Sequence, residues 1–287
     1  MRRPIHILLI DDDQAYCETV AEDAERFNLK ISMAHNFEDG FQLLEEKRKF
    51  KAVILDDRCI LSASQAQGTG KRNFVIKALD KLNQLEHQFQ RMVPFCINAE
   101  NPQEFAEDFE GITEVFQKSN DHSLMMKFLI DKIFLLPEIQ AKARHEDVFE
   151  FVEDFLNEED EDLLCDILIH NEKHDTASIV SNLSNLRRLE EKLCDCLAIN
   201  ILEMKPFQFE EMHQSRTKTI LKMLYDKRIL PQFLYDFSMD LYTIASRYGN
   251  HNPPMRTKNA YFPTAYTVQV LSAIFLDLIT WAKQKIK

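Results

Sequence analysis

The first half of the chain alternates between short apolar runs and segments whose apolar residues recur at helical spacing. The apolar runs that we interpret as strands are 5–10, 29–34, 52–55, 93–97 and 113–116. The segments with helical spacing follow them, over 14–27, 37–44, 73–90, 102–109 and 121–134. Because strands that alternate with helices form parallel sheets covered on both faces, residues 5–135 are predicted to form a five-stranded, doubly wound α/β domain.

The second half of the chain has helical periodicity and no strand-like runs. We expect helices within 146–170 and over 176–203, 218–226, 231–246 and 265–285. An acidic run over 158–162 is expected to be solvated, or to separate two helices. The predicted division is therefore an α/β domain over 1–136, an acidic helical connector over 137–175 and an all-α bundle over 176–287.

Length and charge narrow the classes of function. A chain of 287 residues is long enough for two domains with separate cores. Its net charge of −12 argues against broad binding to nucleic acids, and we identify no helix-turn-helix motif for DNA. No apolar run approaches the length that spans a bilayer, so no membrane association is expected. The six cysteines lack metal-ligand spacing, which is typical of free thiols in the cytoplasm.

Charged residues stand directly after three of the predicted strands. Asp11 and Asp12 follow the first strand, Asp56 follows the third, and Lys118 closes the fifth. In an open α/β sheet the carboxyl ends of parallel strands meet at one edge, where ligands bind. Three carboxylates and one ammonium at that edge predict a site for a hard divalent cation and a phosphoryl group, because Mg²⁺ prefers carboxylate oxygens, water and phosphate.

Residues 5–135 resemble the receiver domain of two-component response regulators, which has a flavodoxin-like fold. The resemblance depends on the acid pair Asp11-Asp12 after an apolar strand, on Asp56 and on Lys118. It implies that Asp56 accepts a phosphoryl group and that Asp56 holds Mg²⁺ together with the acid pair. Lys118 would then pair with the phosphoryl oxygens. The resemblance also implies a histidine kinase or a small phosphodonor as partner.

The sequence departs from the receiver pattern at several positions. The fourth strand ends in Asn98, where the family has Ser or Thr, and is followed by the expected Ala99; both are candidate phosphoryl-binding residues. Asp57, next to the acceptor, is expected to be solvated, although it could add a fourth carboxylate. The loop that ends at residue 72 is longer than usual. Two interpretations follow: a phosphorylatable receiver with altered switching, or a pseudo-receiver that keeps the acids but does not switch.

A short polar segment near the end of the chain raises a second possibility. Arg247, Gly249 and His251 follow an apolar helix, and residues 176–285 resemble HEPN-type helical domains of the abortive-infection group. Active members cleave RNA with an Arg and a His that have four to six residues between them, whereas only three separate Arg247 from His251. We favour a helix C-terminus with Gly249 as a left-handed cap, and keep Arg247 and His251 as candidate catalytic residues.

Together these patterns predict a cytoplasmic signalling protein. Its Mg²⁺-dependent receiver would control a helical output domain, which we expect to act through homodimerisation. One alternative is a receiver that gates a HEPN-type ribonuclease, in which case RNA is the substrate. Another is a pseudo-receiver scaffold that binds a partner without phosphorylation.

Overall fold

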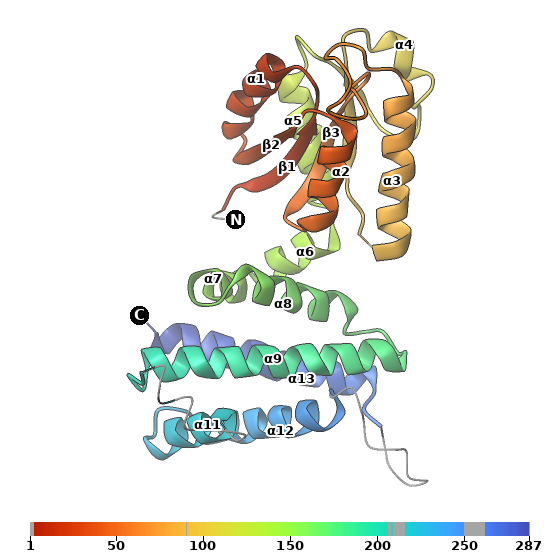
Figure 1. The fold of residues 1–287 in the computed structure, drawn as a ribbon. Coiled ribbons are helices and arrows are strands. Elements are labelled where there is room, and N and C mark those ends of the chain that lie inside the picture. The colour runs from red at the N-terminus through yellow and green to blue at the C-terminus, as the bar shows by residue number, and fades with distance from the viewer. Residues whose placement is uncertain (1–2, 90, 206–207, 209–215, 250–261, 287) are drawn as a thin grey trace. The chain divides into compact units, whose positions relative to one another are not determined.

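The computed structural model describes residues 3–89, 91–205, 208, 216–249 and 262–286 (Figure 1). The chain forms two compact units, Met1–Ile139 and Gln140–Lys287. The first is an α/β domain and the second is a helical bundle, which confirms the predicted fold class.

The first unit contains a parallel five-stranded sheet with the order β2-β1-β3-β4-β5. Its strands are β1 (Ile5–Ile10), β2 (Leu29–Ala34), β3 (Phe50–Asp56), β4 (Phe95–Ala99) and β5 (Val115–Gln117). β4 and β5 begin later than the apolar runs at 93 and 113 suggest. The shift places Asn98 and Ala99 within β4, and Lys118 directly after β5.

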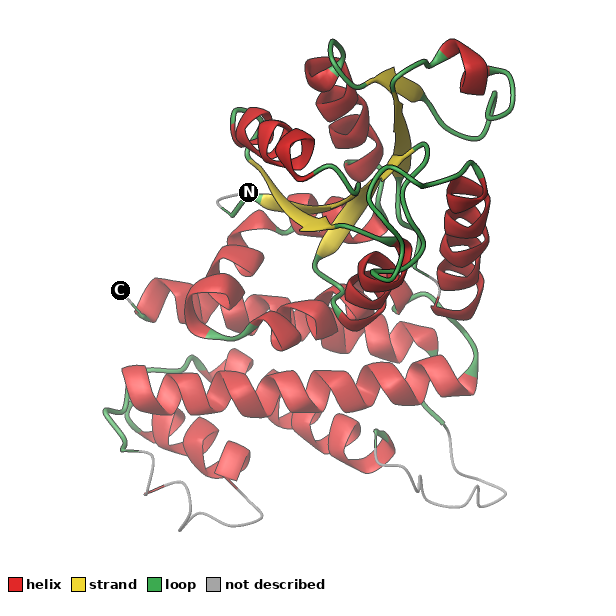
Figure 2. Ribbon diagram, turned by 45° about the horizontal axis from the view of Figure 1, so that its top comes forward, coloured by secondary structure: helices red, strands yellow, loops and turns green. Residues whose placement is uncertain are grey.

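Helices cover both faces of the sheet (Figure 2). They are α1 (Gln14–Glu25), α2 (Phe37–Glu46), α3 (Asn73–Phe89), α4 (Gln103–Ala106) and α5 (His122–Ile133), and α6 (Pro137–Arg144) follows. Successive side chains of a strand point to opposite faces. Thus Ile7 and Leu9 of β1 pack with α1 and α5, while Leu8 and Ile10 pack with α2 and α3. Burial on both faces explains why the strands read as continuous apolar runs.

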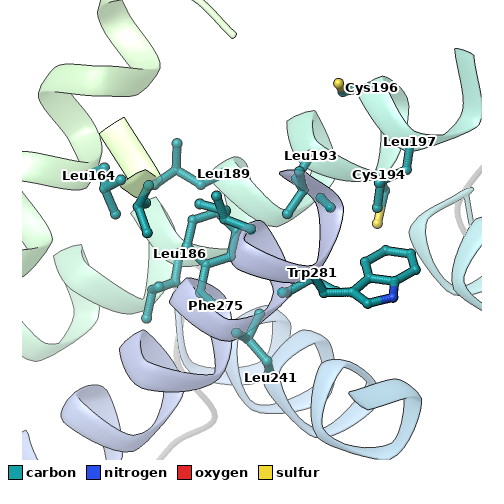
Figure 3. Close-up of a cluster of buried hydrophobic side chains, with 14 of the residues drawn as sticks. Leu164, Leu186, Leu189, Leu193, Cys194, Cys196, Leu197, Leu241, Phe275 and Trp281 are labelled. Carbon is teal, nitrogen blue, oxygen red and sulfur yellow. The ribbon is translucent and has the colours of Figure 1, made fainter. Parts of the chain in front are cut away.

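The second unit is built around one long helix. Its helices are α7 (Glu146–Phe155), α8 (Glu158–His170), α9 (Thr176–Asn200), α11 (Arg216–Asp226), α12 (Gln232–Tyr248) and α13 (Ala265–Lys285). α9 contacts α8, α11, α12 and α13 (Figure 1). Figure 3 shows leucines of α9 meeting Leu241 of α12 and Phe275 and Trp281 of α13. Because α7 and α8 share this core, most of the region 137–175 belongs to the second unit.

The acidic run at residues 158–162 begins α8. Asn157 caps this helix, and its side-chain oxygen accepts a hydrogen bond from the backbone N–H of Asp160 at 2.9 Å. Acidic side chains in the first turn interact favourably with the positive end of the helix dipole. The expectation of a solvated run is wrong for two of its members, because Asp160 and Glu161 are buried. Glu161 forms an ion pair with Lys142 of α6, so its charge has a partner although the side chain is buried. The run does not itself separate two helices, because the break between α7 and α8 lies before it, at 156–157.

Among the described helices, α13 is long and apolar enough to cross a membrane by length and composition. The expectation that no segment approaches this length was therefore too strict. Half of its most apolar stretch is buried inside the second unit, and Leu271, Phe275 and Leu278 belong to the core. A core helix of a folded domain has the same composition, so α13 is explained by its packing.

Candidate functional site

The carboxyl ends of four neighbouring strands bring the predicted site residues of the first unit together. Asp56 lies opposite Asn98 in the β3–β4 register. Asp11 directly follows β1, and its backbone N–H donates to the Ala34 carbonyl at 3.0 Å. The backbone N–H of Lys118 donates to the carbonyl of Ala99 at 3.1 Å, which fixes the start of the Lys118 side chain beside β4.

The Lys118 ammonium lies between two carboxylates. Its Nζ is 2.8 Å from Asp11 Oδ2 and 2.7 Å from Asp56 Oδ1. Asp11 is fully buried and Asp56 is 4% exposed, so these ion pairs are poorly screened by solvent. The three side chains therefore form a compact charged centre at the edge of the sheet.

This centre carries more negative charge than the ammonium neutralises. Burial raises the pKa of Asp11 to about 6, and the nearby charge of Asp56 adds to the effect. Burial likewise raises the pKa of Asp56 to about 6, although the Lys118 charge opposes the shift. Burial alone would lower the pKa of Lys118, but Asp56 and Asp11 raise it above its ordinary value. An additional cation would stabilise the ionised carboxylates.

Side chains at this edge have the spacing of a metal site. Ligand atoms of Asp12, Asp56 and Cys59 lie within 4.8 Å of one another. Burial raises the pKa of the Cys59 thiol, which disfavours the thiolate that binds metals. The two carboxylates suit a hard cation that binds oxygen. Asp11 is not part of this group of ligand atoms. It forms the ion pair with Lys118, and it accepts a hydrogen bond from the backbone N–H of Asp13 at 2.9 Å.

Asp57 is buried, so the expectation that it is solvated is wrong. It is 6% exposed, and its Oδ2 lies 3.3 Å from Nε of Arg58. Its backbone N–H donates to the carbonyl of Asn98 at 3.1 Å, which holds Asp57 beside the end of β4. Burial raises the pKa of Asp57. A further acidic group thus lies directly beside Asp56.

The loop between β3 and α3 reaches back to the site. The backbone N–H of Gly68 donates to Asp12 Oδ2 at 2.6 Å. Gly70 lies so close to the loop's own start that an added Cβ would meet the Arg58 carbonyl oxygen at 1.2 Å. The extra length noted in the sequence therefore folds over the acidic edge, and it occupies one oxygen of a predicted metal ligand.

Sequence analysis missed an aromatic and a histidine residue beside these groups. Nδ2 of Asn98 donates a hydrogen bond to the hydroxyl of Tyr16, and Nζ of Lys118 lies 5.0 Å from the centre of the Tyr16 ring. The His122 ring contacts Tyr16 edge-on at 5.5 Å. Tyr16 could have been found, because it lies in the first turn of the helix that directly follows the acid pair. His122 likewise begins the helix that follows Lys118.

The structure tests one part of the Arg247–His251 hypothesis. Arg247 is exposed in the last turn of α12, and its guanidinium lies 5.5 Å from the ring of Tyr248. His251 is outside the described residues, so the pair stays a prediction. The left-handed cap expected at Gly249 is wrong, because its φ of −81° and ψ of −3° are right-handed. Gly249 instead allows a close approach: a Cβ there would lie 2.6 Å from the backbone nitrogen of Ser184.

No protein-family model and no curated protein matches this chain. Among solved structures, it is similar to the signal receiver domain of a protein described as a Luxo repressor from Vibrio parahaemolyticus. That match has 16% identity and a TM-score of 0.34, and covers 52% of this chain and 98% of the domain. A fusion protein with a trimeric coiled-coil segment of yeast Spc42 matches with 13% identity and a TM-score of 0.34, over 52% and 91% of the two chains. The parallel five-stranded sheet with its acidic edge fits a receiver fold.

Proposed function

We propose that the chain is a response-regulator-like signalling protein in which Asp56 accepts a phosphoryl group. The observation that supports this most is the charged centre at the carboxyl edge of the sheet. There the buried Asp56 lies 2.7 Å from the Lys118 ammonium and within 4.8 Å of ligand atoms of Asp12 and Cys59. The chemistry requires a nucleophilic carboxylate, a cation for the transferred oxygens and little competing water.

In the proposed reaction, an Asp56 oxygen attacks the phosphorus atom of the donor. For acetyl phosphate, the bond between phosphorus and the acetyl oxygen breaks and acetate leaves with its electron pair. The product is an acyl phosphate on Asp56, and the Lys118 ammonium shifts from the carboxylates towards the new phosphoryl oxygens. Asp12 and Asp56 would hold Mg²⁺, which when bound neutralises charge on the donor and on the transferred group. In this proposal a histidine kinase is the natural donor, and the helical unit is the output domain.

The test is the intact mass of the full-length protein after incubation with acetyl phosphate and Mg²⁺. Wild type should gain one phosphate, and Asp56→Asn should gain none. Asp80→Asn, an exposed acid on α3, is a matched control that should behave as wild type. Loss of the adduct when Mg²⁺ is chelated would support the metal requirement. An unmodified wild-type protein in excess Mg²⁺ and acetyl phosphate would contradict the proposal.

A second function, a scaffold built on a pseudo-receiver, is favoured by the loop that covers Asp12. The Gly68 N–H occupies an Asp12 oxygen at 2.6 Å, and metal binding must displace or share it. If the loop never opens, the site stays unphosphorylated and the unit binds partners constitutively. The same mass measurement separates the two functions, because only the phosphorylatable receiver forms an adduct.

A further inference from the structure

Tyr16 occupies a defined position between three elements of the site. It lies in the first turn of α1, where its backbone N–H donates to the helix cap Asp13 at 3.1 Å. Its hydroxyl accepts a hydrogen bond from Asn98 of β4, and its ring lies against the Lys118 ammonium after β5. The half-buried side chain is therefore held at the same edge of the sheet as Asp56.

The phenol has a donor capacity that the described part of the protein does not use. A tyrosine hydroxyl both accepts and donates. Here its oxygen accepts from Asn98 Nδ2, and no hydrogen bond among the described residues uses its proton; Oδ1 of the same amide is buried and also has no hydrogen-bond partner there. Burial raises the pKa of Tyr16 above its ordinary value, so the hydroxyl keeps that proton at neutral pH. A hydroxyl that is held in place, has a proton to donate and lies beside an ammonium is suited to bind an anion.

His122 is a second residue that contacts the Tyr16 ring. One of its ring nitrogens, Nε2, lies 2.6 Å from the Lys118 carbonyl oxygen, and Nδ1 lies 2.9 Å from Asp23 Oδ2. The imidazole is thus fixed by β5 and α1, and its ring contacts Tyr16 edge-on at 5.5 Å. Since Asp23 and Tyr16 both belong to α1, His122 fastens this helix to the Lys118 loop.

We propose that the Tyr16 hydroxyl donates a hydrogen bond to a phosphoryl oxygen on Asp56, beside the Lys118 ammonium. This inference rests on the proposed function. Lys118 supplies positive charge to the phosphoryl group, and Tyr16 adds a neutral, directional donor. Asn98 acts indirectly: its amide nitrogen holds the phenol oxygen, and the phenol proton is left for the phosphoryl group. The hydroxyl that binds the phosphoryl group would thus come from Tyr16 of α1.

Three variants of the full-length protein separate the hydroxyl from the ring. Tyr16→Phe keeps the ring against Lys118 and His122 and removes only the hydroxyl, whereas Tyr16→Leu removes both. Tyr266→Phe, an exposed tyrosine of the helical unit, controls for the substitution itself. The rate of adduct formation is measured by intact mass with acetyl phosphate and Mg²⁺. Thermal unfolding of each variant, followed by circular dichroism, shows that the first unit is folded.

If the hydroxyl acts, Tyr16→Phe and Tyr16→Leu should both form the adduct about tenfold more slowly than wild type and Tyr266→Phe. A wild-type rate in Tyr16→Phe with a slow Tyr16→Leu would overturn the proposal, because the ring alone would then account for the effect. A wild-type rate in both variants would also overturn it. If the wild-type protein forms the adduct, either of these two results overturns only the role of Tyr16, and phosphorylation of Asp56 stands. If the wild-type protein forms no adduct, the proposed function itself is contradicted.

Discussion

The site is dominated by an imbalance of charge among a few side chains. Asp11 and Asp56 share one ammonium, and Asp57 lies beside them with Arg58 as its partner. Burial raises the pKa of both shared carboxyls, and the charges of neighbouring carboxylates add to the rise. Clusters of perturbed acids are typical of functional sites, because removing charge from water is tolerated where a ligand later compensates it. The stability of the first unit should therefore depend on pH and on cations.

Asp56→Asn should stabilise the first unit at pH 7.5 when no divalent cation is present. The pKa of both carboxyls is raised to about 6 from 3.8, so the stability they contribute is complete below about pH 4 and is lost as pH rises through about 6. The variant removes one of the two charges and should be more stable at pH 7.5 by about 3 kcal/mol, which is the rise of the Asp56 pKa from 3.8 to about 6 converted to free energy. At pH 4 the difference should disappear.

The measurement is urea unfolding at pH 4 and pH 7.5 in chelator, with Asp80→Asn as the control. Equal stability of wild type and Asp56→Asn at both pH values would contradict the argument from crowding. A variant that is less stable at pH 7.5 would show that the ion pair with Lys118 outweighs the repulsion between the carboxylates. Added Mg²⁺ should stabilise wild type more than the variant, since the variant lacks one oxygen ligand.

Individual site residues could be predicted only where a regular element positions them. Asp11, Asp56 and Lys118 meet because parallel strands end at one edge, which the apolar pattern reveals. The burial of Asp57 cannot be predicted from periodicity, because this residue lies in the bend after β3, where no repeating pattern places side chains. For the same reason, the sequence does not identify Cys59 as a residue of the site.

At the level of whole elements, the sequence predicted most helices and strands but not how closely they approach. The boundaries of α13 coincide with those expected, because capping and apolar periodicity are local signals. The close approach of α12 to α9 joins residues far apart in the sequence, so local signals do not predict it. Local signals also do not predict the burial of Glu190 on α9. This acid is fully buried, and its two carboxylate oxygens have no hydrogen-bond partner among the described residues. Helical periodicity places it in the apolar stripe, but predicts nothing about its partners.

Gly249→Ala should destabilise the second unit. Its backbone dihedrals suit alanine, so the substitution by itself should be neutral or slightly stabilising. The added Cβ, however, would lie 2.6 Å from the Ser184 nitrogen and 2.8 Å from the Leu183 carbonyl carbon. Because backbone atoms cannot rotate away, α12 and α9 must separate, at a cost of about 1–3 kcal/mol.

Unfolding in urea, followed by tryptophan fluorescence, measures this cost. Gly111→Ala in the first unit is a useful comparison, since its site has open space but a φ of +77°. It should leave the fluorescence transition unchanged. A Gly249→Ala protein as stable as wild type would mean that the two helices adjust without loss of packing, and that glycine is not required there.

The molecule as a whole joins two units that can be observed separately. Each has a hydrophobic core of its own, and the single tryptophan, Trp281, lies in the core of the helical unit. Fluorescence therefore reports the second unit, whereas the acidic edge belongs to the first. A chain with two cores need not unfold in one step. The two units can thus be tested for communication without any label.

Mg²⁺ alone should raise the unfolding midpoint of the first unit and leave the tryptophan transition where it is. A ligand stabilises what it binds, and the carboxylates that would hold the cation lie in the first unit. Acetyl phosphate together with Mg²⁺ is expected to move the tryptophan transition as well, because an output domain controlled by Asp56 must change its free energy when Asp56 is modified. In Asp56→Asn the tryptophan transition should not respond. A wild-type protein that forms the adduct but keeps an unchanged tryptophan transition would carry its signal through the surface of the first unit, with the helical unit as a passive partner.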